Sequence, residues 1–301
     1  MLKTGSKMSK ESFPSISCRI HDDRLTLIAP RKKLTQEICD KLRRYEESKR
    51  ENRELRDEQI WTLLFTYGFV AGPESRQALS DLAKVLTEGE CAWAPDRKAW
   101  LAMLPVPLRK GLRGDSEGNT EIDLILGDIA ARDRTQSGIE FKPNGNPSWV
   151  CMVEAKWLSD IACQTTHDLH RTQLIRVIEN ALTFQTINGQ ARYPDQAHVT
   201  LLTPGAFRHD GEPSGSRFYY YKYNEYKQYP YLVLTDLGRS AIEMRRDFTD
   251  WSYPEDLISH LERLRLHWVT YEELFKRMPD TEFKMEFKEF IANNANGVIS
   301  V

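Results

Sequence analysis

Two short apolar runs, each bounded by turn-forming residues, dominate the pattern of hydrophobic and polar positions. They cover residues 120–127 and 148–157. Continuous apolar runs of this length are typical of buried strands. The polar residues 128–147 between them contain Pro and Gly, and we expect them to form a long connection.

The rest of the chain is mainly helical in pattern. A further strand is expected at residues 198–203, reached through a helix and therefore parallel, in a right-handed crossover. Residues 18–29 are expected to hold one or two short strands, and the Trp- and Pro-bearing residues 88–114 an irregular packed segment. Apolar residues at helical spacing predict helices over residues 34–67, 74–86, 166–187, 257–266, 271–278 and 283–292.

The tyrosine-rich residues 218–232 are open to two interpretations. Their high β propensity predicts half-buried strands whose phenols face water, which we favour. The alternative is a surface on which single-stranded bases stack.

Composition narrows the class of protein. A chain of 301 residues with 40% hydrophobic content predicts one core of ordinary size with additions. The net charge of −2 gives no overall attraction to nucleic acid, so any such binding must use local patches. Five cysteines without Cys-x-x-Cys spacing predict a reducing cytoplasm. No signal peptide and no apolar run of the ~20 residues that a membrane span needs are evident, so we expect a soluble protein without membrane partners.

Ionisable residues within the two apolar runs indicate chemistry. Side chains alternate along a strand, so antiparallel pairing of the runs would bring Asp123, Glu154 and Lys156 together. Buried charges are costly unless they pair or hold a metal. Two carboxylates form an oxygen site suited to Mg²⁺ or Mn²⁺, and a lysine beside them can orient a water or neutralise charge on a phosphate. The alternative is an edge hairpin with a solvated charged face.

Asp123 followed by Glu154-Ala155-Lys156, with the order of elements around them, resembles the PD-(D/E)xK nuclease superfamily over roughly residues 74–205. The Pro-Asp dipeptide of the family name is absent, because Ile122 precedes Asp123. The resemblance implies a restriction-endonuclease-like α/β fold with an αββαβ core. It also implies a mixed central sheet and Mg²⁺-dependent cleavage of DNA, less often RNA.

The resemblance also implies roles for individual residues. Asp123 and Glu154 would bind the metal with the carbonyl of Ala155, and Lys156 would be catalytic. A helix before the first strand often supplies another acid in this superfamily, for which Glu74 is the candidate, although we favour stabilisation of the helix macrodipole as its role. Glu58 is the alternative if the helix assignments shift.

The predicted helix at residues 166–187 carries two further candidate features. Gln173 is a second-tier catalytic candidate, since one branch of the superfamily has a Gln-x-x-x-Tyr motif at a similar place; here Val177 replaces the tyrosine. His167 and His170 have a spacing compatible with a metal, but no third ligand is near them in sequence. We therefore expect them to be surface histidines.

These observations predict three regions and one function. The regions are an N-terminal tail, short strands and a charged helix (1–72), a nuclease core (73–240) and a helical C-terminal region (241–301). The expected function is a Mg²⁺-dependent DNA endonuclease, with Mn²⁺ as a substitute ion, in bacterial defence or DNA processing. Gating by a protein partner or by homo-oligomerisation is also expected. The alternative is a non-catalytic nuclease-fold module that binds nucleic acid or a protein partner within a larger assembly.

Overall fold

A seven-stranded mixed sheet is the centre of an α/β fold, with the strand order β3-β4-β1-β2-β5-β6-β7. The computed structural model describes residues 15–48, 55–105, 121–132, 138–144, 146–161, 172–183, 193–208, 217–243 and 259–301. The strands are β1 (Lys98–Pro105), β2 (Ile122–Gly127), β3 (Ile129–Ala131), β4 (Gly138–Phe141), β5 (Trp149–Ala155), β6 (Gln196–Thr203) and β7 (Leu264–Thr270).

The strand pairing confirms the central expectation from the sequence. β2 is antiparallel to β5, with Leu124 opposite Val153, and it is also antiparallel to β1. β5, β6 and β7 are parallel neighbours, and the chain passes from β5 to β6 through α5 (Gln173–Thr183). The predicted mixed α/β sheet and the parallel crossover are therefore confirmed.

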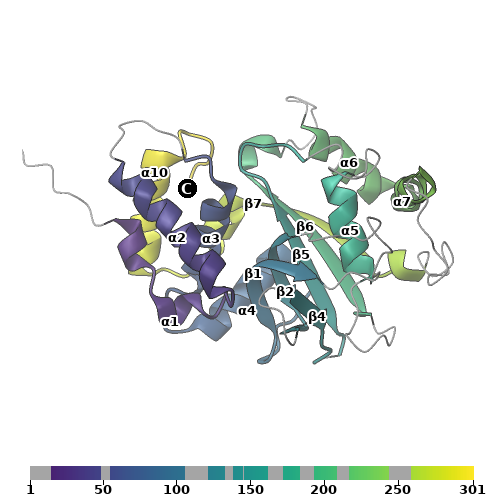
Figure 1. The fold of residues 1–301 in the computed structure, drawn as a ribbon, viewed down its shortest axis with the longest axis horizontal. Coiled ribbons are helices and arrows are strands. Elements are labelled where there is room, and N and C mark those ends of the chain that lie inside the picture. The colour runs from purple at the N-terminus through teal and green to yellow at the C-terminus, as the bar shows by residue number, and fades with distance from the viewer. Residues whose placement is uncertain are drawn as a thin grey trace, which may run out of the picture.

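Helices cover both faces of the sheet (Figure 1). Alternation along the strands directs Leu124 and Val153 to one face and Ile125 and Met152 to the other. The face of Leu124 and Val153 packs on η1 (Ile16–Arg19), α1 (Asp22–Leu25), α2 (Lys32–Glu47), α3 (Glu58–Val70), α4 (Ser75–Leu86), α9 (Tyr271–Arg277) and α10 (Glu282–Asn294). The face of Ile125 and Met152 packs on α5, α6 (Phe218–Gln228) and α7 (Tyr231–Glu243), and η2 (Gly205–Phe207) follows β6.

Among the described residues, no helix combines the length and the apolar character that crossing a membrane requires.

The beginning of α3 is fixed against the end of β5. The Asp57 side chain caps α3 by accepting a hydrogen bond of 3.2 Å from the Ile60 N–H. The ring of Trp61 stacks on that of Trp157, with centroids 4.1 Å apart, and both rings are fully buried. This packing places the first turn of α3 beside the residues that follow β5.

Several local predictions were wrong. Residues 18–29 form η1 and α1 instead of strands, and the expected irregular segment contains β1. Residues 218–232 are helical: Tyr219, Tyr223 and Tyr226 are buried at helical spacing, so periodicity prevailed over β propensity. β7 begins at Leu264, inside a region expected to be wholly helical, whereas α9 and α10 match the predicted helices. The boundaries proposed at residues 72 and 240 remain predictions.

A buried ion pair lies where β2 ends and β5 begins. The Arg97 guanidinium lies 3.1 Å from Asp128, and both side chains are at least 96% buried. The other Asp128 oxygen accepts a hydrogen bond of 2.8 Å from the Trp149 N–H. We expect Asp128→Ala to lower the free energy of unfolding by about 3–5 kcal/mol, because it leaves the Arg97 charge buried without its partner. Urea unfolding would measure this, and a loss below about 1 kcal/mol would contradict it.

Candidate functional site

The site lies where β2 begins and β5 ends. Extending the observed register by one residue places Asp123 directly opposite Glu154, on the same face of the sheet. Lys156 follows β5, and its backbone N–H donates a hydrogen bond of 2.8 Å to the carbonyl of Leu202 on β6. The structure therefore brings together the three ionisable residues that the sequence singled out.

Lys156 is the centre of this group. Its Nζ lies 2.8 Å from Oε1 of Glu154 and 3.1 Å from Oε1 of Glu58. Lys156 and Glu154 are only 4% and 1% exposed, whereas Asp123 keeps partial access to solvent. Among the described residues, the buried Oε1 of Glu154 has no hydrogen bond of good geometry, so its contact with Lys156 is a close but poorly directed ion pair.

Asp123 fixes the end of β5 through the backbone. Its Oδ2 accepts a hydrogen bond of 2.8 Å from the N–H of Ala155. The N–H and C=O of one strand residue point toward the same neighbouring strand. The Ala155 carbonyl therefore also points toward β2, as a backbone metal ligand beside Asp123 requires.

Glu58, rather than Glu74, is the acid that a preceding helix brings to the site. Oε2 of Glu58 accepts hydrogen bonds from the Trp157 N–H at 2.9 Å and from Ser159 Oγ at 3.0 Å. Glu74 is exposed at the start of α4, beyond the opposite end of α3. A helix of thirteen residues is about 20 Å long, so the preference for Glu74 was wrong and the alternative, Glu58, contacts Lys156.

Burial dominates the electrostatics of the site. It raises the pKa of Asp123 well above the ordinary 3.8, and the neighbouring charge of Glu154 raises it further. Burial also raises the pKa of Glu154 above 4.5, although Lys156 opposes this. For Lys156, burial alone would lower the pKa, but the carboxylates outweigh it and the net pKa is raised.

The donor set fits a hard divalent cation. When ionised, the three carboxylates of Glu58, Asp123 and Glu154 carry three negative charges against one ammonium, an excess of two. Carboxylate and carbonyl oxygens are the ligands that Mg²⁺ prefers. In the described part of the chain, three candidate ligand atoms lie within 4.8 Å of one another only at Glu90, His198 and His267. The carboxylates around Lys156 are therefore farther apart than this and must move closer together to bind one ion.

The start of α5 faces the same end of the sheet. The N–H of Ile175 donates to Thr172 Oγ1 at 3.1 Å, which places Gln173 in the first turn of this helix. Arg176 lies close enough for its charge to lower the pKa of Glu154. Positions three apart are neighbours on a helix surface, so Gln173 and Arg176 lie on adjoining parts of α5. His167 and His170 lie outside the described residues.

The raised carboxyl pKa values predict an unusual dependence of stability on pH. Between the ordinary values (3.8 for Asp123 and 4.5 for Glu154) and the raised ones, the folded chain binds more protons than the unfolded chain. Stability therefore falls as pH rises through this window. In EDTA, we expect the contribution of Asp123 and Glu154 to the free energy of unfolding to decline from about pH 4 upward. Urea unfolding at a series of pH values should show a smaller decline in Asp123→Asn than in the unaltered protein; identical slopes would contradict this.

No family model, curated protein or solved structure matches this chain.

Proposed function

We propose that this protein is a divalent-cation-dependent nuclease that hydrolyses phosphodiester bonds in DNA, with a restriction-endonuclease-like core. The observation that carries the proposal is the buried Lys156 ammonium between Glu154 and Glu58, with Asp123 opposite on the adjacent strand. The order α4, β1, β2, β5, α5, β6, with β3 and β4 inserted between β2 and β5, supports it, because a helix, antiparallel strands, a helix and a parallel strand follow one another as expected for that core.

The carboxylates of Asp123 and Glu154 would hold Mg²⁺ or Mn²⁺, together with the Ala155 carbonyl. Glu58 is close enough to Lys156 to complete the acidic surroundings. When bound, such a cation polarises the phosphate and offsets the negative charge that develops during hydrolysis. Partial exposure of Asp123 and Glu58 gives solvent and substrate access to a site in which Glu154 and Lys156 are buried.

Lys156 acts in its protonated form. Because its pKa is raised, it is an ammonium at neutral pH and has no lone pair with which to accept a proton. It therefore serves as a hydrogen-bond donor and a positive charge, not as a general base. Donation to a phosphate oxygen or to the attacking water would orient the reactants and stabilise charge in the transition state.

Arg176 and Gln173 supply the local contacts to phosphate that the net charge of −2 does not. Arg176 would neutralise phosphate charge, and the Gln173 amide would donate a hydrogen bond. Contacts to phosphate carry no sequence information, so these residues position DNA without selecting a sequence. We place the enzyme in bacterial defence or DNA processing and propose that a protein partner or homo-oligomerisation restrains its endonuclease activity.

A cleavage assay tests the proposed function. The purified chain is incubated with supercoiled plasmid in Mg²⁺, Mn²⁺ or EDTA, with single-stranded RNA as a parallel substrate. We expect nicked and linear plasmid with either ion and none in EDTA. Glu74→Gln is the matched control, because this exposed acid lies away from the site and its loss should leave the rate unchanged. Binding of DNA without cleavage under all three conditions would favour the non-catalytic module instead.

A further inference from the structure

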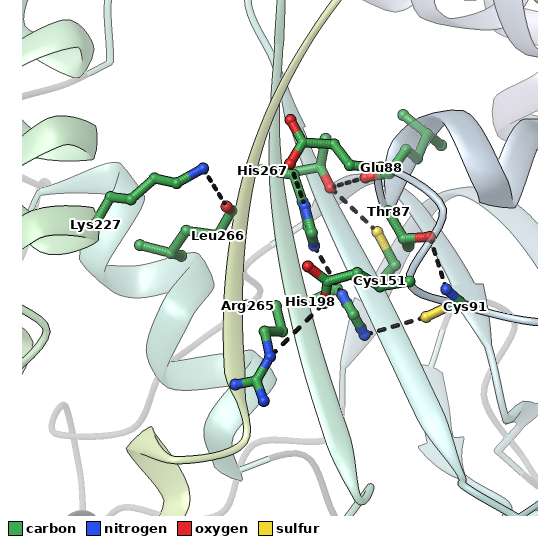
Figure 2. Close-up of polar contacts among 12 residues, drawn as sticks. Thr87, Glu88, Cys91, Cys151, His198, Lys227, Arg265, Leu266 and His267 are labelled. Atoms are coloured by element: carbon green, nitrogen blue, oxygen red, sulfur yellow. Dashed lines mark hydrogen bonds and ion pairs between the residues drawn. The ribbon is translucent and has the colours of Figure 1, made fainter.

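A pair of buried histidines lies on the sheet face opposite that of Glu154. His198 is on β6 and His267 on β7, and they are 0% and 1% exposed. Their rings are nearly parallel and meet edge to edge, with centroids 5.1 Å apart, an interplanar angle of 15° and facing nitrogens 2.8 Å apart. Both face the segment that follows α4, which contributes Glu88 and Cys91 (Figure 2).

Polar contacts link these four residues in a row. His198 Nδ1 lies 2.8 Å from Nε2 of His267. The outer nitrogens also have partners: Nε2 of His198 lies 3.1 Å from Cys91 Sγ, and Nδ1 of His267 lies 3.2 Å from a carboxylate oxygen of Glu88. Every ring nitrogen of the pair therefore has a polar neighbour.

The contact between Cys91 and His198 is not a nucleophilic dyad. Cys91 is 4% exposed, and burial raises the pKa of its thiol to about 12. Burial lowers the pKa of His198 to about 3. At neutral pH the pair is therefore a thiol and a neutral imidazole, and no substrate can reach the sulfur.

Two arrangements of protons fit these contacts. Without a cation, the Cys91 thiol can donate to Nε2 of His198, Nδ1 of His198 to Nε2 of His267, and Nδ1 of His267 to the Glu88 carboxylate. With a cation between the rings, the proton on Nδ1 of His198 would shift to Nε2 of the same ring, which can donate to Cys91 Sγ. The two facing nitrogens then both present lone pairs to the ion.

A third ligand is available at this point. An oxygen of Glu90 and one ring nitrogen from each of His198 and His267 all lie within 4.8 Å of one another. Glu90 is exposed, and its side chain is 3.7 Å from Arg265. The group therefore combines two buried nitrogens with one carboxylate that can move at the surface.

We propose that Glu90, His198 and His267 form a binding site for a Zn²⁺-class ion that ties the segment after α4 to β6 and β7. Two imidazoles and a carboxylate are a common Zn²⁺ ligand set in which a fourth position stays open to water. Cys91 and Glu88 accept the outer N–H groups and so orient the rings, as the outer partners of metal-bound histidines usually do. This site is independent of the proposed nuclease chemistry on the other face.

The geometry requires a small adjustment. Tetrahedral Zn²⁺ with bonds of about 2.0–2.1 Å to nitrogen separates two nitrogens by about 3.3 Å. The facing nitrogens are now 2.8 Å apart, so the rings must separate by about half an ångström. The side chain of Glu90 must also exchange its contact with Arg265 for the ion.

Metal titration of the full chain tests the proposal. After chelator treatment and dialysis, Co²⁺ and Zn²⁺ are added separately, and the visible spectrum of Co²⁺ and the melting temperature with Zn²⁺ are recorded. We expect a four-coordinate Co²⁺ spectrum that saturates at one ion per chain, and a raised melting temperature with Zn²⁺. Glu90→Gln should abolish the four-coordinate spectrum, and Glu88→Ala should weaken binding by roughly 10–100-fold, because it removes the hydrogen-bond partner of His267. Both residues are exposed, so the fold should remain.

Two controls separate this site from the nuclease site. Glu74→Gln changes an exposed acid at the start of α4, the helix that precedes Glu88 and Glu90, and this variant should bind Co²⁺ normally. Asp123→Asn should also bind normally, even though it is expected to lose cleavage. The proposal is overturned if the unaltered protein binds neither ion, if Glu90→Gln binds as tightly as the unaltered protein, or if Asp123→Asn loses the ion.

Discussion

Replacing Lys156 with methionine should lower the rate of Mg²⁺-dependent DNA cleavage by roughly 10²–10³-fold. Methionine keeps an unbranched side chain but removes the ammonium, which lies 2.8 Å from Glu154 and 3.1 Å from Glu58. Single-turnover cleavage of a plasmid at saturating protein would measure the chemical step directly. A rate within threefold of the unaltered protein would contradict the proposed role.

The same variant should also be less stable, a point that the sequence did not reveal. The sequence places Lys156 in a candidate site but does not show how deeply its ammonium is buried. In the structure it is buried against two carboxylates, so its removal leaves Glu154 without compensation and should cost up to about 3 kcal/mol.

A second variant separates loss of fold from loss of chemistry. The double variant Glu154→Gln, Lys156→Met removes both charges of the pair and should regain much of the stability, because neither charge is then buried alone. It should remain inactive. Recovery of cleavage with recovery of stability would show that Lys156 is structural.

Replacing Asp123 with asparagine should lower cleavage at least as much and should also remove the response to Mg²⁺. The amide oxygen of asparagine can still accept the hydrogen bond from the Ala155 N–H, so the end of β5 should keep its geometry. Loss of the negative charge weakens the binding of a divalent cation at this site. Melting temperatures with and without Mg²⁺, alongside cleavage rates, would measure both effects. Normal cleavage activity, or a Mg²⁺-induced rise in melting temperature equal to that of the unaltered protein, would contradict the role of Asp123.

The geometry of Asp123, Glu154 and Lys156 could be predicted because it depends on short-range rules. Alternation along a strand and antiparallel pairing suffice to bring the three together. Glu58 is different: it is separated from Lys156 by 98 positions, and only the packing of Trp61 on Trp157 brings the start of α3 there. No local pattern favoured it over Glu74.

The histidine pair was missed for a similar reason. His198 and His267 are 69 positions apart on two parallel strands, and β7 lies in a region where the sequence indicated helices. Sequence spacing instead indicates His167 and His170, which are only three positions apart. Likewise, β propensity misled the assignment of Tyr219, Tyr223 and Tyr226, although their spacing already matched a helix.

Anomalous diffraction from crystals grown with Mn²⁺ tests the central claim most directly, because it locates the ion without reference to activity. The account predicts a peak roughly 2.1 Å from carboxylate oxygens of both Asp123 and Glu154, with the Ala155 carbonyl as a further neighbour. Well-ordered crystals with no peak there, or with Mn²⁺ only beside His198 and His267, would contradict it.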